Sequence, residues 1–439
     1  MNLDVFHNRL DGLKLGQLQG RVIEVGPSFL FSDGPLCAPG DICVIRDHKK
    51  NEICRAEVVG ISTRRVTLMP LDPAPRLMPN FLVELVDNQG DAIVGDSFGS
   101  RMVDALGRPI DFQGRLNLTT VRPLSGQVPA PLERASNNQP LETGIKAVDT
   151  LIPLAKGQRI GIFAASGVGK TTLVTQIARQ TDCDRCILCL VGERGREVEA
   201  MWSSILSGVS AAELTAVVAT SDQPAALRVR VVEQALAMAE FWRDQGEDVV
   251  IIIDSITRYA MALREVGLAA GAPPTMRAYT PNVFAALPRV VERCGAVVKG
   301  GSITGIFSVL SETDDIDDPI VEAMKSYLDG HIVLSRELAE TGLFPAIDIP
   351  RSISRLAPEL LSEDKLSLSR AVVSNLSIYR RSRMLIESGM YKAGSDSKID
   401  RAVALKDGLE SFLRQSSSER VSRSQSESLL AALMGGAHG

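Results

Sequence analysis

The sequence lacks the features that mark several classes of protein. Across its 439 residues, no apolar run approaches the roughly 18 residues that a membrane-spanning helix requires. Residues 1–15 do not show the cationic and then apolar layout of a secretory signal. The net charge of −5 gives no basic excess of the kind that nucleic-acid binding demands. We therefore expect a protein that works in the cytoplasm and has no nucleic acid as a partner.

The seven cysteines do not form a convincing metal or disulfide framework. Cys183 and Cys186 have Cys-x-x-Cys spacing, which is also found in metal sites. Cys186 opens an apolar run and Cys189 lies inside it, so the three thiols are not expected to converge with tetrahedral geometry. We expect reduced thiols packed in the interior, and metal binding is the alternative.

The length of 439 residues and a hydrophobic content of 45% suit about three domains with substantial cores. Leu3, Phe6 and Leu10 have the spacing of a short amphipathic helix, although a frayed chain end is equally compatible with this pattern. Short β-like runs separated by turn residues follow and predict a small β-barrel. The predicted parts are an amphipathic segment (1–17), the barrel (18–90), a nucleotide-binding domain (91–357) and a helical domain (358–439).

The stretch 159–172 is the most informative part of the chain, because it reads as a strand, a glycine-bearing turn and a helix start. Gly167 and Gly169 can turn N–H groups toward phosphate oxygens, and Lys170 supplies a compact cation. The predicted nucleotide-binding residues here are Ala165, Ser166, Gly167, Val168, Gly169, Lys170, Thr171 and Thr172, with the Thr171 hydroxyl as a ligand of Mg²⁺. The alternative is a glycine-rich turn in an ordinary α/β fold.

Two later strands end in carboxylates that could complete an ATPase. Five aliphatic residues precede Asp254, which is typical of a buried parallel strand whose end faces a ligand. Asp254 is therefore predicted to hold Mg²⁺ through water beside Thr171. Glu193 follows another apolar strand and is predicted to orient and polarise the attacking water as a general base. The alternative for Glu193 is a surface carboxylate paired with Arg196.

These motifs and several others resemble the ATPases of type III secretion. The resemblance rests on Gly-Glu-Arg-Gly-Arg-Glu-Val (192–198), Asp-Ser-Ile-Thr-Arg-Tyr-Ala (254–260), Gly-Gly-Ser-Ile-Thr (300–304), Asp-Gly-His-Ile-Val-Leu-Ser-Arg (329–336), Pro-Ala-Ile-Asp-Ile (345–349) and Ser-Ile-Ser-Arg (352–355). The family comprises the flagellar export ATPase and its injectisome counterparts, which are similar to the catalytic subunits of rotary ATP synthases. Ala164, at a position where the phosphate-loop motif usually has glycine, also resembles the secretion branch.

The resemblance implies an α/β fold, with a RecA-like P-loop central domain built on a mostly parallel sheet. An N-terminal small β-barrel and a C-terminal helical domain would flank it. It further implies ATP and Mg²⁺ as cofactors and a homohexameric ring.

The resemblance also assigns four more residues. Arg194 and Arg258 would line the γ-phosphate pocket, with structural ion pairing as the alternative for each. Arg355 would reach across a subunit boundary to the neighbour's γ-phosphate, where an arginine finger is typically worth about 10³–10⁵ in rate. Phe344 would stack on adenine, and the alternative is a buried core phenylalanine.

The implied partners belong to a secretion apparatus. The turn at 389–396 would face the ring centre, where a central stalk protein binds, and the C-terminal region would receive export chaperones and their cargo. A negative regulator or peripheral stalk protein would contact the N-terminal segment. Export gate membrane proteins would place the ring at the inner-membrane secretion apparatus. The acidic run at 314–319 is predicted to be a solvated loop, because it lacks the glycine and terminal glutamate of a Ca²⁺ loop.

Three other functions remain compatible with parts of the sequence. A catalytic subunit of a rotary ATP synthase or ion pump would share the core, but Ala164 and the 389–396 turn argue against it. An RNA-dependent ring ATPase is disfavoured by the scarcity of interleaved aromatic and basic residues in the N-terminal part. An inert nucleotide-binding scaffold would not need Glu193, Asp254 and Arg355 together. The motifs are common to flagellar and injectisome systems, so they do not distinguish the two.

Overall fold

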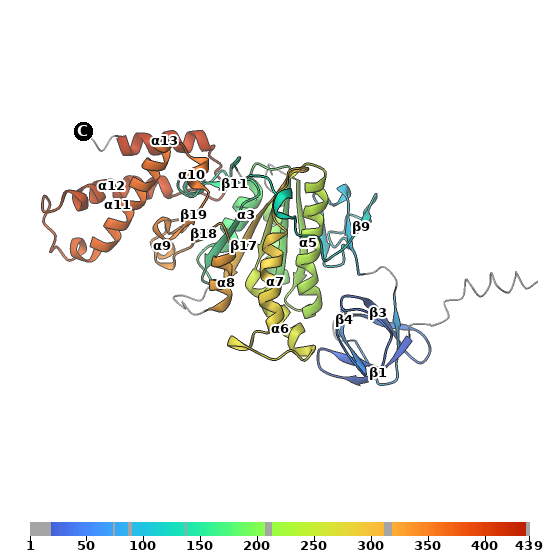
Figure 1. Cartoon of the computed structure of the whole chain (residues 1–439). Helices are drawn as coiled ribbons and strands as arrows, with labels where there is room; N and C mark the ends of the chain where they lie inside the picture. Colours follow the sequence, from blue (N-terminus) through green and yellow to red (C-terminus); the bar gives the residue numbers. More distant parts are fainter. Residues whose placement is uncertain are drawn as a thin grey trace, which may run out of the picture. The chain divides into compact units, whose positions relative to one another are not determined.

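The computed structural model describes residues 19–72, 75–86, 90–136, 138–206, 213–310 and 318–435 (Figure 1). The chain forms two compact units. The first contains the chain up to Asp91 together with 222–228 and 262–283, and the second contains the rest. The predicted amphipathic segment at 1–17 and residues 314–317 of the acidic run lie outside the described residues.

The first unit contains a closed antiparallel barrel with the strand order β1-β2-β5-β4-β3-β6. Alternate residues of β4 point inward, among them Cys54, Ala56 and Val58, as expected for strands that enclose a small core. The barrel predicted from the sequence is thereby confirmed. Its strands are β1 (Gln19–Val25), β2 (Leu30–Ser32), β3 (Ile42–Arg46), β4 (Glu52–Ser62), β5 (Arg65–Pro70) and β6 (Leu82–Leu85).

The second unit is built on a nine-stranded sheet whose main path runs β19-β18-β12-β17-β15-β13-β14-β8, with β16 paired to β17. All pairs from β18 to β8 are parallel, and β16 and β19 are antiparallel. The mostly parallel sheet is thus confirmed. The strands are β8 (Met102–Asp104), β12 (Arg159–Ala164), β13 (Arg185–Glu193), β14 (Glu213–Thr220), β15 (Asp248–Asp254), β16 (Gly295–Ala296), β17 (Ser302–Leu310), β18 (Gly330–Val333) and β19 (Ile353–Ser354).

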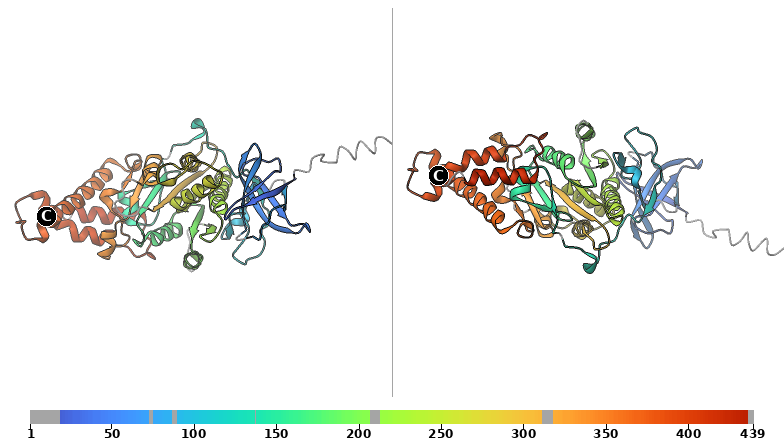
Figure 2. Two further views of the ribbon diagram at one scale, coloured as in Figure 1. Left: turned by 90° about the horizontal axis from the view of Figure 1, so that it is seen from below. Right: turned by 90° about the horizontal axis from the view of Figure 1, so that it is seen from above.

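The central strands are buried almost throughout, because helices cover both faces of the sheet (Figures 1 and 2). The helices that follow these strands are α2 (Lys146–Leu151), α3 (Lys170–Gln180), α4 (Gly195–Leu206), α5 (Ala225–Asp244), α6 (Ile256–Ala269), α7 (Pro281–Glu292), α8 (Pro319–Tyr327) and α9 (Arg336–Glu340). Because β12, β17, β15 and β13 are neighbours and parallel, their carboxyl ends meet along one edge of the sheet.

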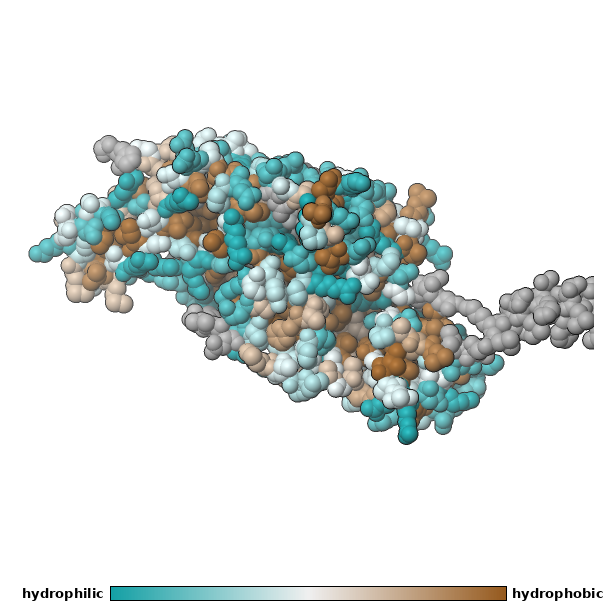
Figure 3. Space-filling model, viewed as in Figure 1, coloured by the Kyte–Doolittle hydropathy of each residue, from teal (hydrophilic) through white to brown (hydrophobic). Residues whose placement is uncertain are grey.

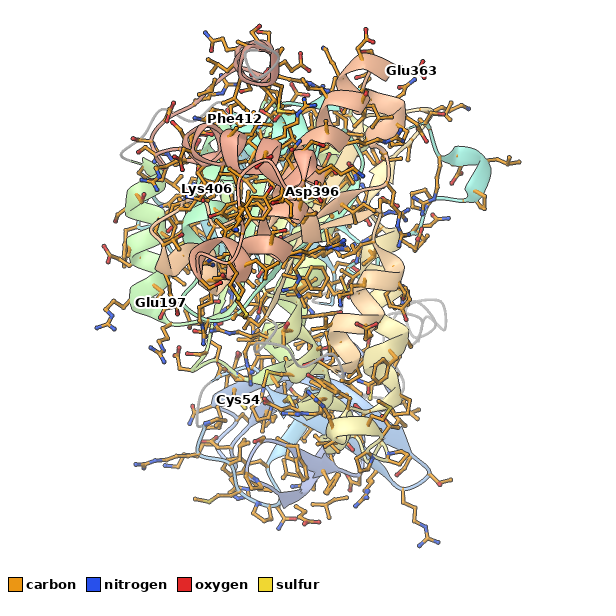
Figure 4. The ribbon with its side chains drawn as sticks, turned by 90° about the vertical axis from the view of Figure 1, so that its left-hand side faces the viewer. Cys54, Glu197, Glu363, Asp396, Lys406 and Phe412 are labelled. Carbon is orange, nitrogen blue, oxygen red and sulfur yellow. The ribbon has the colours of Figure 1, made fainter. Side chains whose placement is uncertain are left out.

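The tail is helical, as predicted, and it shares the core of the second unit. Its helices are α10 (Ala357–Leu360), α11 (Glu363–Glu387), α12 (Ser397–Leu413) and α13 (Arg423–Gly435). Val372, Leu409, Phe412 and Leu430 belong to the same buried cluster as the sheet residues Ile162 and Leu188. Figure 4 shows the tail helices with Glu363, Asp396, Lys406 and Phe412 labelled. Burial of these apolar side chains holds the tail against the sheet.

Shorter elements complete the two units, and η3 among them belongs to the first. They are β7 (Ala92–Val94), β9 (Thr120–Arg122), β10 (Pro140–Leu141), β11 (Leu154–Ala155), and the 3₁₀ helices η1 (Asp96–Phe98), η2 (Pro131–Glu133), η3 (Met276–Ala278) and η4 (Ile349–Arg351). On the face shown in Figure 3, apolar side chains are interspersed among hydrophilic ones. Within the described ranges, no helix combines the length and the apolar character needed to cross a bilayer.

All seven cysteines are free thiols, as predicted, and five of them are buried. Burial raises the pKa of Cys43, Cys54 and Cys294 to about 12, so these thiols stay protonated at neutral pH. They pack as small apolar side chains, and none has the low pKa of a reactive cysteine.

Candidate active site

The predicted phosphate-binding loop joins the end of β12 to the start of α3. Gly167 and Gly169 adopt left-handed backbone angles, with φ of 81° and 90°, which side chains with a Cβ rarely tolerate. Gly169 caps α3 without a side-chain hydrogen bond, so the first N–H groups of this 11-residue helix remain available to an anion. The loop therefore has the geometry that the motif predicts.

Lys170, Asp254 and Ser308 meet at the carboxyl edge of the sheet. Asp254 Oδ1 accepts hydrogen bonds from Lys170 Nζ and, at 2.6 Å, from Ser308 Oγ. Lys170 Nζ also lies 3.1 Å from Ser308 Oγ. Asp254 is 1% exposed, and its second oxygen, Oδ2, has no hydrogen-bond partner among the described residues. A buried carboxylate oxygen without a partner is costly, so this atom is suited to an incoming ligand.

Ser308 was not among the residues predicted from the sequence. It lies in the buried strand β17, which neighbours both β12 and β15. The available signal in the sequence was a hydroxyl residue near the end of an otherwise apolar strand. This signal is weak, because most side-chain hydrogen bonds in proteins are made to the backbone or to water. The sheet order reveals its role, because it places Ser308 between the lysine and the aspartate.

Glu193 ends β13 close to this cluster and is 8% exposed. Burial and the negative charge of Asp254 raise the pKa of the Glu193 carboxyl, while the charges of Arg258 and Lys170 oppose that shift. Arg258 Nη1 lies 2.7 Å from Glu193 Oε2 and also donates to the Gly192 carbonyl. The structure thus pairs Glu193 with Arg258, and the alternative of a surface carboxylate paired with Arg196 is wrong.

Arg194 follows Glu193 in the chain but points elsewhere. Its side chain is 73% exposed, and its Nη1 lies 3.7 Å from Glu197 Oε1 on the first turn of α4. An exposed pair of this length holds a side chain weakly. Of the two arginines assigned to the γ-phosphate pocket, the structure brings Arg258 to Glu193 and leaves Arg194 at the exposed surface.

A cavity of about 290 Å³ opens beside the first turn of α3. Thr171 and Thr172 line it together with α4 and with Ser417 from the tail. The ring of Phe344 lies close to Gly169 of the loop, since a Cβ added to this glycine would meet the ring at 3.5 Å. Phe344 is 46% exposed, so it is not the buried core side chain of the alternative interpretation.

Arg355 lies just after β19, at the far edge of the sheet path from β13. Its backbone N–H donates to the Asp329 carbonyl at 3.0 Å, while its side chain is exposed. Across the described ranges, its guanidinium makes no ion pair. The structure therefore does not bring Arg355 to the lysine, aspartate and glutamate of its own chain.

Comparison with known families shows the class of protein to which this site belongs. Residues 144–354 match the family model for the nucleotide-binding domain of the ATP synthase alpha/beta family. Residues 361–432 match the model for the C-terminal domain of the EscN ATPase of type III secretion systems. This is a nucleotide-binding core of the ATP synthase type joined to a secretion-type tail.

The chain belongs to the type III secretion ATPase family. It is 40% identical over 419 residues to the flagellum-specific ATP synthase of Bacillus subtilis, covering 95% of each chain. It is 39% identical over 403 residues to the type 3 secretion system ATPase of Xanthomonas euvesicatoria, covering 92% of this chain and 91% of that protein.

A solved structure supports the same assignment over most of the chain. The assembled ATPase EscN from enteropathogenic E. coli superposes with a TM-score of 0.88 at 35% identity, covering 94% of this chain and 99% of that one. EscN in complex with its central stalk EscO superposes with a TM-score of 0.84, also at 35% identity and with the same coverage. The predicted fold class and family are confirmed.

Proposed function

We propose that this chain is a Mg²⁺-dependent ATPase that works as a homohexameric ring and energises protein export through a type III secretion apparatus. The observation that carries this function is the meeting of Lys170, Asp254 and Glu193 at one edge of the sheet, in a chain of this family. Relatives named for flagella and relatives named for type 3 secretion systems match at similar identity, so either apparatus is compatible.

The phosphate loop and Lys170 would hold the β- and γ-phosphates of ATP. Lys170 is paired with Asp254 in the structure, so nucleotide binding would transfer its ammonium group from the carboxylate to the phosphates. Asp254 and Thr171 fit Mg²⁺, because the partnerless Asp254 Oδ2 and the exposed Thr171 hydroxyl are oxygen donors beside the loop. The bound cation would neutralise charge that develops on the phosphates.

Glu193 would hold the attacking water and accept its proton. Its raised pKa makes it a stronger base than an ordinary glutamate, and its burial beside Asp254 supports a role close to the γ-phosphate. Arg258, fixed by Glu193 and the Gly192 carbonyl, would face the same phosphate group. Arg194 would join them by a change of rotamer. Phe344, partly exposed against Gly169, would stack on adenine.

Arg355 would act in trans, on the nucleotide of the neighbouring subunit. Its exposed side chain and its separation from the carboxylates of its own chain support this role. A planar guanidinium can bind two phosphate oxygens at once and stabilise the charge of the transition state. Each complete site would then require two subunits.

Apolar side chains at the end of α11 suit a protein partner. Met384 is 80% exposed and Met390 is 68% exposed, and Leu385 lies between them in the chain. Exposed clusters of flexible apolar side chains commonly mark protein contacts. We propose that a central stalk protein binds here, with chaperones and cargo on the same C-terminal region. A negative regulator or peripheral stalk protein and the export gate membrane proteins complete the expected partners of a cytoplasmic ring at the inner membrane.

Substitution of Glu193 by glutamine tests the enzymatic role. Glu193→Gln keeps the size of the side chain but removes the base, so MgATP turnover should fall about 10²–10⁴-fold while nucleotide binding is kept. Glu199→Gln on the exposed face of α4 is the matched control and should hydrolyse ATP at the normal rate. Normal turnover by Glu193→Gln would remove Glu193 from the mechanism, and strong stimulation by RNA would favour the RNA-dependent ring instead.

A further inference from the structure

Asp348 organises the segment that ends in Arg355. It is 6% exposed and caps η4, accepting the Arg351 N–H at 3.2 Å. Its own N–H donates to the Val333 carbonyl of β18 at 2.8 Å, and its carbonyl accepts from Ser352 Oγ at 2.7 Å. Ser352 Oγ in turn accepts the Val333 N–H at 3.0 Å. Asp348 therefore fixes η4 and the entry of the chain into β19, the strand that leads directly to Arg355.

A residue of the tail holds the same carboxylate. Arg380 of α11 donates Nη1 to both oxygens of Asp348, at 3.1 and 2.9 Å. The Arg380 side chain is 48% exposed, whereas that of Asp348 is 8% exposed, so the ion pair lies at the boundary between the surface and the interior. The pair ties a tail helix directly to the cap of η4.

The surroundings of this pair are not closely packed. A cavity of about 260 Å³ adjoins it and is lined by α9, η4, α11 and α12, with Tyr379, Lys406 and Glu410 among the lining residues. Closely packed side chains transmit a displacement from one element to the next, and a cavity does not. Here the ion pair between Arg380 and Asp348 can couple a movement of α11 to η4 instead.

We infer that Arg380 is a positioning residue for Arg355, linking the α11–α12 helices to the arginine finger through Asp348. A displacement of α11, such as a partner bound at its exposed end would cause, shifts η4 and with it the guanidinium offered to the neighbouring subunit. This inference rests on the proposed role of Arg355 in trans.

Arg380→Ala tests the link in the full-length protein. Turnover at saturating ATP in assembled rings should fall about tenfold, because small displacements of a catalytic group are costly. The KM for ATP and the fraction of hexamer should stay at the wild-type values, with turnover measured well below the melting temperature of the variant. Arg380→Lys should recover part of the loss. The control is Arg383→Ala, on the same helix but paired with Glu337 and Glu387 instead of η4, and it should keep normal turnover.

A double-mutant cycle separates positioning from a structural effect, with single-turnover hydrolysis used so that slow rates remain measurable. In the Arg355→Ala background, Arg380→Ala should cause no further loss, since the group that it positions is gone. If the two losses multiply, or if Arg380→Ala alone hydrolyses ATP normally, the positioning role is overturned while the finger stands. If Arg355→Ala alone hydrolyses ATP normally, the finger itself is wrong and the inference falls with it.

Discussion

At the scale of single residues, the charges around Glu193 determine its chemistry. Burial and Asp254 raise its pKa, whereas Arg258 and Lys170 lower it, so the carboxyl is a base whose strength depends on its neighbours. A general base must be deprotonated to act. Because the pKa is raised, the rate should begin to fall at a higher pH than for an ordinary glutamate as the solution is acidified.

Removal of Arg258 tests this balance. The positive charge of Arg258 lies 2.7 Å from Glu193 and lowers the pKa of its carboxyl. Arg258→Gln deletes this charge, so the pKa of Glu193 should rise and the acidic limb of the pH–rate profile should move to higher pH. The profile is best measured by single-turnover hydrolysis with MgATP, each curve scaled to its own maximum. Arg196→Gln, on the neighbouring exposed turn, is the control and should leave the limb in place. A limb that stays or moves to lower pH in Arg258→Gln would contradict the assigned electrostatics.

At the scale of elements, the segment after α12 joins the tail to the nucleotide site. Gln415 is 4% exposed, and its side chain accepts the Lys146 N–H at 2.8 Å and donates to the Gly144 carbonyl at 2.7 Å. Its backbone N–H donates to the carbonyl of Phe344 at 2.9 Å. The residue predicted to stack on adenine is therefore held by the chain segment that leads out of α12.

Truncation of Gln415 should weaken both stability and nucleotide binding. Gln415→Ala leaves buried backbone groups without partners, which costs about 1–3 kcal/mol of unfolding free energy. The variant keeps the backbone N–H that binds the Phe344 carbonyl, so the Kd for ATP should rise through loosening of the segment that carries this N–H. Gln425→Ala, at an exposed position of α13, is the control for denaturant unfolding and nucleotide titration. Unchanged stability and affinity in Gln415→Ala would show that the segment does not support the site.

Some parts of this site could be predicted from sequence and others could not, for a physical reason. Glu193 and Asp254 each end an apolar strand, and Lys170 follows the loop that leaves the end of another. The carboxyl ends of parallel strands share one edge. Local pattern therefore placed them together. Ser308 and Gln415 act through partners far away in the chain, and their side chains carry no local pattern. Their roles became visible when the sheet order and the docking of the tail were known.

At the scale of the whole molecule, the site residues are divided between the two edges of the sheet. Glu193 and Asp254 end β13 and β15 at the carboxyl edge. Arg355 lies at the amino edge, because it follows β19, which runs antiparallel to β18 and pairs Ser354 with Gly330 at the start of that strand. The phosphate loop follows the carboxyl end of β12, so a single chain with this topology cannot offer its own Arg355 to that loop without a large rearrangement. A closed ring resolves the separation, because each subunit can present one edge to the next.

The most direct test mixes two inactive variants. Glu193→Gln lacks the base but keeps the finger, and Arg355→Ala lacks the finger but keeps the base. In rings formed from an equal mixture, about a quarter of the subunit interfaces would combine an intact base with an intact finger from the neighbour. ATP turnover should therefore reappear on mixing, although each variant alone is inactive. Mixed rings that form but hydrolyse no ATP would contradict a catalytic site shared between subunits.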